Sequence, residues 1–282
     1  MPGMDFMEVL KITSTQNKTV KEAVKLRDRR DREAANLTLR EGYRELSRAL
    51  EYGRTIKEVF FCPEQFLGVN EPALLEALYQ HGAKIFQVPD FLLNKMAYRD
   101  RPEGLIATMT MVKHDLASMP VVENGFYMIA EAVEKPGNLG SILRSADAAG
   151  VDGLIICDRR TDIYNPNVIR ASTGALFAVP LAVTETSEVL PWLKNNKILS
   201  IATSPHAEPV YTDIDLTRSL AVVVGTEQVG LSEEWLNAAD INVRIPMLGK
   251  IDSLNVATAA TILLYEVARQ RNWRCGTGKV KL

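Results

Sequence analysis

The chain has 282 residues, of which 46% are hydrophobic and 24% charged, and its formal net charge is -2. This composition is typical of a globular protein with room for two domains, and no apolar run approaches the roughly 20 residues of a membrane helix. The first ten residues lack the pattern of a secretory signal. The three cysteines stand far apart and the three histidines are not paired, which argues against disulfides and a metal site. We therefore expect a cytoplasmic protein without a metal.

The first hundred residues predict a small α/β unit. Apolar residues at helical spacing favour a helix over 37–50, and a second helix is expected over 71–80, with a proline in its first turn. Three short apolar runs predict strands, at 56–62, 84–88 and 104–111. No dense group of catalytic residue types occurs in this part of the chain.

Positive charge gathers near both ends of the chain. Between Lys11 and Arg54 stand twelve basic and seven acidic residues, and the segment from Arg269 to Leu282 holds five basic residues and no acid. Such a distribution suits a surface that binds phosphates. A solvated helix face explains the first segment as well, because acids alternate with its arginines. Charge alone favours the solvated helix face.

A regular alternation of strands and helices follows residues 113–123, which we interpret as a linker. Strands are expected at 126–133, 153–157, 179–183, 197–203, 220–225 and 241–245. Helices are expected at 139–149, 167–175, 187–194 and 232–239, and a long helix at 253–270. Apolar strands that alternate with helices indicate a buried parallel sheet, so the predicted fold class is α/β.

Ligands of such a sheet bind at the carboxyl ends of its strands, and three of these ends carry glycines with polar side chains. The first segment runs from Glu134 to Arg144. Asn138 can cap the following helix there, and Arg144 lies off the apolar stripe of that helix. A helix start with a nearby arginine predicts an anion site. An ordinary strand, turn and helix with an exposed arginine would contain the same residues.

The other two segments follow later strands. In 222–232, Gly225 allows the backbone to approach a ligand closely, and Glu227 stands at the tip of the loop. In 245–257, Ser253 and Asn255 stand where a helix of small residues begins, which suits capping or ligand contact. Both segments are also compatible with an ordinary loop or a helix cap.

In this order and spacing, the three segments resemble the motifs of the SpoU (TrmH) family of RNA 2′-O-methyltransferases, within the SPOUT superfamily. The resemblance covers about residues 123–268, and residues 30–110 resemble, more weakly, the auxiliary substrate-binding domain of that family. The matching positions are Asn138, Gly140, Arg144, Gly225, Glu227, Gly230, Leu231, Pro246, Met247, Gly249, Ser253, Leu254, Asn255, Val256 and Ala257.

The resemblance implies a two-domain organisation. A small ribosomal-protein-like α/β domain that binds the RNA substrate is expected over 1–112, with a basic N-terminal arm. The linker would follow at 113–123, and a SPOUT methyltransferase domain with a deep trefoil knot at 124–282. Knots are nearly absent from proteins, so the residues alone would not predict one. Family members are usually homodimers, with the active site near the interface.

The resemblance also implies that S-adenosylmethionine (SAM) is the methyl donor, held by loops near 225–232 and 246–254. Contacts to SAM are expected from Gly225, Ile245, Met247 and Leu254, and Thr203, at the end of a strand, is a weaker candidate.

For catalysis, the resemblance implicates Arg144 in activating the ribose 2′-hydroxyl. It places Asn138, Ser253 and Asn255 around the ribose and phosphate, with Glu227 holding the geometry of its loop. Since a guanidinium stays protonated, we expect Arg144 to bind the adjacent phosphate and stabilise the developing alkoxide, while the proton passes to phosphate or water. Glu227 is the alternative proton acceptor, because a carboxylate is the better base.

Ribosomal RNA is favoured over transfer RNA, since an auxiliary domain suits a large substrate. The alternatives are the same chemistry on transfer RNA and a non-catalytic RNA-binding protein that has kept the fold. A nicotinamide or nucleotide enzyme is disfavoured, because the G-x-G-x-x-G and G-K-[ST] patterns are absent. The sequence specifies neither the modified nucleotide nor whether the enzyme serves housekeeping or drug resistance. No membrane partner is expected.

Overall fold

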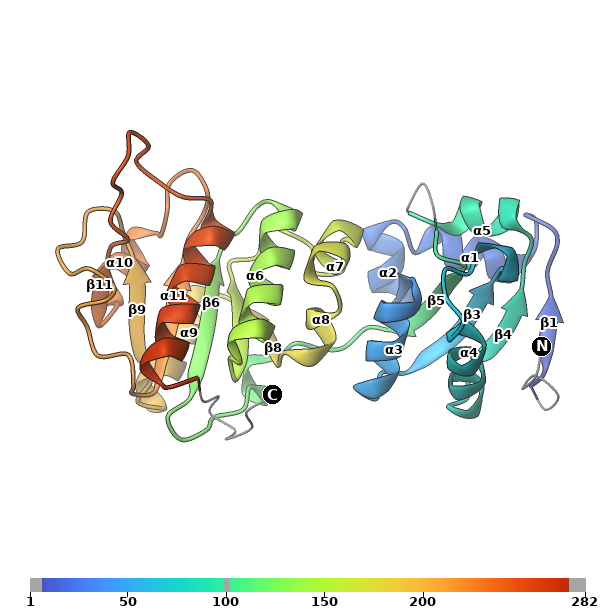
Figure 1. Cartoon of the computed structure of the whole chain (residues 1–282), viewed down its shortest axis with the longest axis horizontal. Coiled ribbons are helices and arrows are strands. Elements are labelled where there is room, and N and C mark those ends of the chain that lie inside the picture. Colours follow the sequence, from blue (N-terminus) through green and yellow to red (C-terminus); the bar gives the residue numbers. More distant parts are fainter. Residues whose placement is uncertain (1–6, 99–101, 274–282) are drawn as a thin grey trace. The chain divides into compact units, whose positions relative to one another are not determined.

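The computed structural model describes residues 7–98 and 102–273. The chain divides into two compact units, Met1–Lys113 and His114–Leu282 (Figure 1). The segment expected to be a linker packs on the second unit from its start, because the carbonyl of His114 accepts a hydrogen bond from the backbone N–H of Val183 at 2.8 Å. Within the described ranges, no helix is both long and apolar enough to cross a membrane.

The first unit contains a five-stranded sheet in the order β1-β4-β3-β5-β2. The strands are β1 (Val9–Lys11), β2 (Leu37–Glu41), β3 (Ile56–Phe61), β4 (Lys84–Gln87) and β5 (Leu105–Thr110). Strands β1 and β3 run parallel to β4, whereas β5 runs antiparallel to both β2 and β3. The carboxyl ends of β1, β2, β3 and β4 therefore meet at one edge of the sheet.

Helices cover both faces of this sheet. The helices are α1 (Lys18–Lys25), α2 (Arg29–Ala35), α3 (Tyr43–Glu51), α4 (Glu71–Gln80) and α5 (Asp90–Met96). One core cluster joins apolar residues of α1 and α5 to Phe60 and Phe86 of the sheet, and α3 and α4 lie together on the other face (Figure 1). The prediction of α4 is confirmed to the residue, whereas β1, α1, α2 and α5 were not predicted.

The predicted helix over 37–50 is wrong in its first half. Residues Leu37–Glu41 form β2, paired with β5, and α3 begins only at Tyr43. Gly42 lies between them with φ 94°, a left-handed conformation that favours glycine and breaks the helix. The side chain of Arg40 in this strand is only 1% exposed, so its charge belongs to the interior of the unit and not to a basic surface.

The second unit contains a six-stranded sheet in the order β11-β9-β10-β6-β7-β8. The strands are β6 (Phe126–Glu131), β7 (Gly153–Cys157), β8 (Leu181–Thr184), β9 (Leu199–Thr203), β10 (Leu220–Val224) and β11 (Ile241–Val243). All five neighbouring pairs are parallel, which confirms the predicted parallel sheet. Its strand residues are almost all buried, as expected of a sheet covered on both faces.

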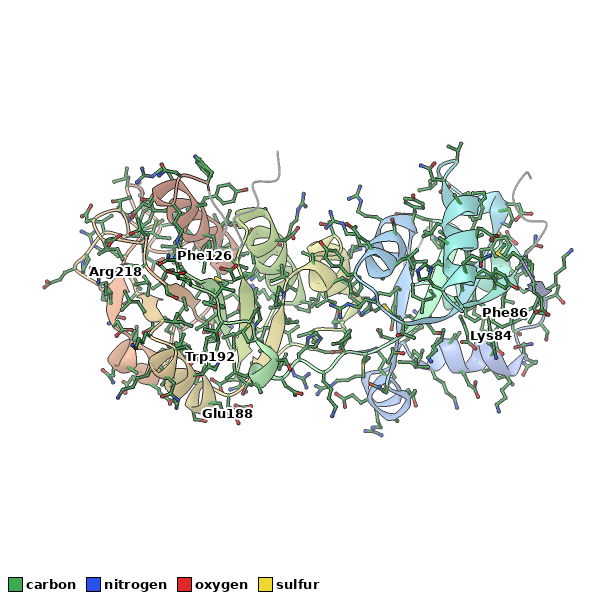
Figure 2. The ribbon with its side chains drawn as sticks, turned by 90° about the horizontal axis from the view of Figure 1, so that it is seen from below. Lys84, Phe86, Phe126, Glu188, Trp192 and Arg218 are labelled. Carbon is green, nitrogen blue, oxygen red and sulfur yellow. The ribbon has the colours of Figure 1, made fainter. Side chains whose placement is uncertain are left out.

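Two layers of helices enclose this sheet. Helices α6 (Pro136–Ala149) and α11 (Val256–Gln270) pack side by side on one face, and α9 (Thr186–Asn195) and α10 (Glu233–Ala238) cover the other (Figure 1). Phe126 and Trp192 lie on these opposite sides (Figure 2). On the α9 side, Tyr127 meets Trp192 edge-on with ring centroids 5.4 Å apart.

The predicted helix over 167–175 is two helices, α7 (Pro166–Ser172) and α8 (Ala175–Ala178). Thr173 and Gly174 between them have φ of 50° and 91°, so the helix cannot continue through them. Helix α7 packs very closely on α6 at Gly140, where an added Cβ would lie 2.6 Å from the carbonyl oxygen of Val168. This close approach explains a glycine in the middle of α6.

The chain crosses back over the sheet after β11. Strand β11 lies at the edge of the sheet, whereas α11 packs against α6 and the internal strand β10. Residues 244–255 therefore return across the carboxyl ends of β9 and β10. The family resemblance places the implied trefoil knot at this returning segment.

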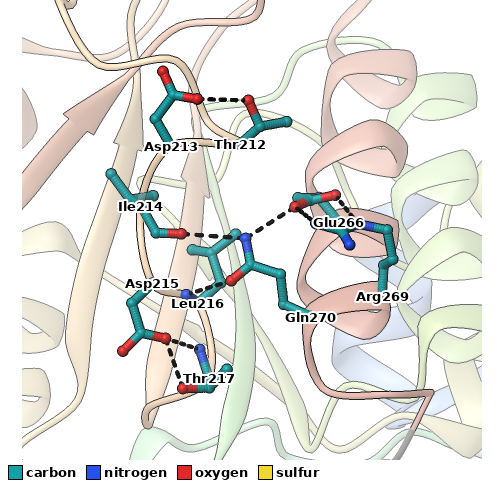
Figure 3. A network of polar contacts seen from close by, with 9 residues as sticks. All are labelled: Thr212, Asp213, Ile214, Asp215, Leu216, Thr217, Glu266, Arg269 and Gln270. Atoms are coloured by element: carbon teal, nitrogen blue, oxygen red, sulfur yellow. Dashed lines mark hydrogen bonds and ion pairs between the residues drawn. The ribbon is translucent and has the colours of Figure 1, made fainter.

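The end of α11 is fastened to the segment before β10 by two neighbouring side chains, of which Figure 3 draws the first, Gln270. The Gln270 amide donates to the carbonyl of Ile214 at 3.2 Å and accepts from the backbone N–H of Leu216 at 2.9 Å. The guanidinium of Arg271 donates to the carbonyl of Asn124 at 2.7 Å and to that of Leu216 at 3.2 Å, with further bonds to neighbouring carbonyls. Burial lowers the pKa of Arg271, so this guanidinium is partly withdrawn from water.

Replacing Arg271 by alanine should destabilise the second unit by about 2–4 kcal/mol, because four backbone carbonyls lose a charged donor that is itself partly withdrawn from water. Arg269→Ala is the matched control, since the Arg269 side chain is 60% exposed and, among the described residues, pairs with Glu266 of its own helix, so its loss should change stability little. All three tryptophans lie in this unit, so their fluorescence during urea denaturation reports on it. Equal midpoints for the two variants would contradict the prediction.

Candidate active site

Three polar side chains from three different motifs meet at the carboxyl edge of the six-stranded sheet. The Asn138 side-chain amide donates to Oε1 of Glu227 at 2.6 Å, and the Asn255 amide donates to Oδ1 of Asn138 at 3.0 Å. Each amide has a second N–H that these contacts leave available to a ligand. The sequence prediction that Asn138, Glu227 and Asn255 share one site agrees with this geometry.

Helix geometry places the two asparagines. Asn255 is the N-cap of α11, and its Oδ1 accepts from the backbone N–H of Ala257 at 2.9 Å. Asn138 was expected to cap α6, but α6 begins at Pro136, so Asn138 lies inside the first turn and its side chain is free to contact Glu227. About two turns further along, Ser145 of α6 and Thr261 of α11 connect the two helices by a hydrogen bond of 2.7 Å between their hydroxyls.

The loop that carries Glu227 is held from several sides. Oε1 and Oε2 of Glu227 accept from the backbone N–H groups of Lys135 and Glu134 at 3.3 and 3.4 Å. At the other end of the loop, the backbone N–H of Ser232 donates to Oε2 of Glu131 at 2.9 Å. Sequence reasoning missed Glu131. Its signal in the sequence is a glutamate at the end of a run of apolar strand residues. In the structure it is only 5% exposed, so it needs a specific partner.

A second missed residue is Thr161, in the loop after β7. Its hydroxyl lies 2.8 Å from the carbonyl oxygen of Val133 and 2.6 Å from that of Glu134. Thr161 therefore fixes the turn that supplies two of the N–H groups around the Glu227 carboxylate. No pattern in the sequence connects these two loops.

The Glu227 carboxylate is stabilised in its ionised form. Burial acts to raise its pKa, but hydrogen bonds from Asn138 and from backbone N–H groups outweigh burial, so the pKa lies below the ordinary value of 4.5. A carboxylate with a lowered pKa is a weaker base. This favours the positioning role of Glu227 over its role as proton acceptor.

Because the folded-state pKa of Glu227 is depressed, its contacts are fully present above pH 4.5 and are lost only as pH falls through the lower folded value. We therefore expect wild type and Glu227→Gln to show rate profiles of the same shape between about pH 5.5 and 9, although the variant is slower. A pH series of initial methyl-transfer rates measures this. An acid limb that appears only in the wild type would instead support Glu227 as the base.

Arg144 and Ser253 lie outside the hydrogen-bonded cluster. Arg144 is on α6, six residues after Asn138, which corresponds to about 9 Å along the helix axis. Its side chain is exposed, and within 7–98 and 102–273 it makes no hydrogen bond or ion pair. Ser253 is also exposed, two residues before the N-cap of α11. Both side chains are available to a ligand from solvent.

The five expected SAM contacts surround the ends of β9, β10 and β11. Gly225 follows β10 directly, and an added Cβ would lie 2.2 Å from the carbonyl carbon of Gly230. Ile245, Met247 and Leu254 are half-buried in the returning segment. The hydroxyl of Thr203 donates to the carbonyl of Val223 at 3.1 Å, which ties it to the neighbouring strand.

The returning segment fits a nucleoside ligand. In the described part of the chain, the backbone groups of 245–254 make no hydrogen bond to one another or to other backbone groups. Large apolar side chains stand exposed in this segment and in the loop 225–232, with Leu248 98%, Ile251 64% and Val229 82% exposed. Free backbone donors and acceptors next to apolar side chains suit the adenine and ribose of SAM.

Comparison with known proteins agrees with this site. The model of the SpoU rRNA Methylase family matches residues 125–265, and that of the MRM3-like substrate binding domain matches residues 17–107. The chain belongs to the SpoU family. It is 34% identical to the 23S rRNA (uridine(2479)-2′-O)-methyltransferase of Streptomyces viridochromogenes, over 87% of each chain. It is 29% identical to the 23S rRNA (guanosine(2553)-2′-O)-methyltransferase RlmP of Bacillus subtilis, over 91% of this chain and 98% of the relative.

Solved structures show the same likeness. An AdoMet-bound rRNA methyltransferase from Sinorhizobium meliloti has a TM-score of 0.85 and 29% identity, over 93% of this chain and 98% of its own. The SpoU methyltransferase AviRb from Streptomyces viridochromogenes, in complex with AdoMet, has a TM-score of 0.81 and 32% identity, over 91% and 99%. The predicted family, fold class, enzyme class and methyl donor are confirmed, as is RNA as the substrate class.

Proposed function

We propose that the protein methylates one ribose 2′-hydroxyl of 23S ribosomal RNA with SAM as the donor. The observation that carries the proposal is the contact of Asn138, Glu227 and Asn255, one residue from each of the three motifs, beside a backbone segment free to bind a nucleoside. Two relatives that match most of the chain are named for 2′-O-methylation of 23S rRNA. An intact polar cluster argues against a non-catalytic protein that has only kept the fold.

The chain's residues have two tasks in this reaction, alignment of the hydroxyl and removal of its proton. SAM supplies a methyl group already activated by the positive sulfur. The free N–H groups of Asn138 and Asn255, with the Ser253 hydroxyl, would orient the ribose and its phosphate. Arg144 would bind the adjacent phosphate and stabilise the alkoxide as the new O–CH₃ bond forms, and the proton would leave to phosphate or water.

Incubation with radiolabelled SAM and fractionated RNA tests the proposal. We expect label in the large-subunit ribosomal RNA, at one nucleotide whose ribose resists alkaline cleavage on its 3′ side. Label in transfer RNA alone would establish the alternative substrate. Absence of label in both fractions, with SAM binding intact by calorimetry, would support a non-catalytic RNA-binding protein.

The proposal includes a homodimer and a cytoplasmic location. The support for a dimer in this chain is an exposed aromatic pair near the end of α11, in which Tyr265 and Trp273 are 42% and 59% exposed and their rings lie 6.2 Å apart. Arg144 is also exposed, on the neighbouring helix α6, as expected of an active site near a dimer interface. Light scattering coupled to gel filtration should give twice the chain mass for wild type and the monomer mass for Tyr265→Asp. A monomeric wild type that is fully active would contradict the dimer.

RNA binding by the basic N-terminal segment should depend steeply on salt. Lys18, Lys21 and Lys25 are exposed along α1, whereas Arg32 is buried and donates to the carbonyls of Leu26 and Arg27. We expect Lys21→Ala/Lys25→Ala to reduce the slope of log affinity against log salt by about two, one for each lost phosphate contact. Fluorescence anisotropy over a salt series measures the slope. The basic tail predicted to help, from Arg269 to Leu282, lies largely outside the described residues.

A further inference from the structure

The five-stranded sheet of the first unit has a pocket at its carboxyl edge. It lies beyond the ends of β1, β3 and β4, and its polar lining includes Lys11, Thr13, Glu64 and Asp90. Its volume of about 420 Å³ is in the range of small-ligand pockets. The pocket lies wholly within the first unit, and none of the residues of the SAM site contributes to it.

Helix α5 begins at this pocket with Asp90, and the next residue, Phe91, exposes an aromatic side chain. Leu92, Leu93 and Met96 of α5 are buried, whereas Phe91 is 53% exposed, and Lys95 is exposed one turn further along the same face. An exposed phenylalanine next to a lysine is the arrangement by which proteins stack an unpaired base and hold its phosphate.

Two hydrogen bonds hold α5 in place, so Phe91 is presented on a fixed element. The Gln65 amide, which follows β3, donates to Oδ1 of Asn94 at 3.0 Å. At the other end, the guanidinium of Arg27 lies 3.4 Å from the carbonyl oxygen of Lys95 and 5.1 Å from the ring centre of Tyr98. Arg27 therefore adds a second cation at the Lys95 end of α5.

Negative and positive side chains occupy different places in and around the pocket. Glu64 and Asp90 place two carboxylates in the pocket, and each has one oxygen already bonded, to the Cys62 thiol at 3.1 Å and to the backbone N–H of Phe91 at 2.7 Å. Their remaining oxygens can only accept hydrogen bonds while ionised. They would repel a phosphate but accept from the N–H groups of a base. Lys11 lines the pocket with the carboxylates, and Lys95 is exposed one turn along α5 from Phe91, so the two cations suit the phosphates on either side of the base.

We propose that this pocket and the exposed face of α5 bind one unpaired nucleotide of the substrate RNA, with its base stacked on Phe91. Guanine is the preferred base, because its Watson–Crick edge presents an imino and an amino donor side by side to the Asp90 and Glu64 carboxylates. The inference rests on the proposed function, since it assigns the first unit to the same RNA. It gives the substrate-binding domain a nucleotide-specific contact in addition to its basic surface.

Binding of short RNA to the full chain tests the site without SAM or turnover. The probes are fluorescein-labelled single strands of about ten uridines, with either guanosine or uridine at the centre, read by anisotropy. We expect the guanosine strand to bind about tenfold more tightly. Phe91→Ala should remove this preference and weaken binding of both strands, whereas Phe91→Trp should retain both. Asp90→Asn should reduce the preference and leave uridine binding unchanged.

Two control variants lie near the opposite edge of the same sheet. Tyr52→Ala removes an aromatic side chain, 36% exposed, after the end of α3, and Lys84→Ala removes an exposed lysine at the start of β4. Both should bind the probes as wild type does, whereas Lys95→Ala should lose about threefold to tenfold in affinity. Equal binding by Phe91→Ala and Tyr52→Ala, or no preference for guanosine in the wild type, would overturn the inference. Failure of methyl transfer with guanosine preference intact would count against the proposed function alone.

Discussion

Replacing Arg144 by alanine should lower the rate of methyl transfer by about 10²–10³-fold while leaving SAM affinity unchanged. Arg144 is exposed on α6 and, in the described part of the chain, makes no hydrogen bond to the backbone segment 245–254, so its loss should not disturb the nucleoside site. It is the cation that we assign to the phosphate and the developing alkoxide. Single-turnover rates with saturating SAM and RNA separate this effect from binding, and calorimetry measures SAM affinity.

Arg144→Lys distinguishes two explanations of that loss. If a positive charge is sufficient, lysine should restore most of the rate that alanine loses. If the planar, two-pronged guanidinium is needed, lysine should be as slow as alanine, because it binds phosphate as a point charge. A full rate of methyl transfer in Arg144→Ala would show that Arg144 has no role in the mechanism. Glu227 would then be the remaining candidate for the proton acceptor.

The position of Arg144 shows what sequence could and could not predict about this site. The motif order identified three loops that do converge, and Asn138, Glu227 and Asn255 are in contact. The same pattern did not show that Arg144, about 9 Å further along α6, stays outside this hydrogen-bonded cluster. A site completed across a dimer interface would account for this separation, because α6 exposes Arg144 outward.

Residues that support the site were less predictable than residues in it. Glu131 and Thr161 act through contacts with loops 101 and 27 or 28 positions away in the chain. Such contacts follow from the strand order, in which β6 lies between β10 and β7. Hydrophobic periodicity predicts single elements and not their neighbours, so these partners have no local signal.

The first unit shows the limit of periodicity itself. The apolar residues over 37–50 fit one helix, but pairing with β5 makes Leu37–Glu41 a strand, and Gly42 allows the sharp change of direction. The strand β1 has only three residues and exists because β4 offers it a parallel edge. Tertiary pairing outweighs local preference in both places. The second unit was predicted better because its buried strands are continuous apolar runs.

Gly225→Ala should lower SAM affinity at least tenfold and destabilise the second unit by about 1–3 kcal/mol. The added Cβ would lie 2.2 Å from the carbonyl carbon and oxygen of Gly230 and 2.4 Å from the backbone nitrogen of Leu231. All three are backbone atoms, so relief requires the loop to move. The pair of hydrogen bonds between the backbones of Thr226 and Gly230, at 2.8 and 3.2 Å, would open, and Leu231 would shift in the core.

Gly137→Ala is the control for this variant, because Gly137 lies at the same edge of the sheet and an added Cβ there meets no atom within 4 Å. It stands in the first turn of α6, where alanine should keep or slightly raise stability. Calorimetric titration with SAM and denaturation followed by tryptophan fluorescence should separate the two variants in both readouts. Loss of SAM affinity in Gly225→Ala with an unchanged midpoint would mean that the loop yields easily and that Gly225 itself approaches the nucleoside. If both variants bind SAM like wild type, the tight backbone contact at Gly225 does not shape the cofactor site.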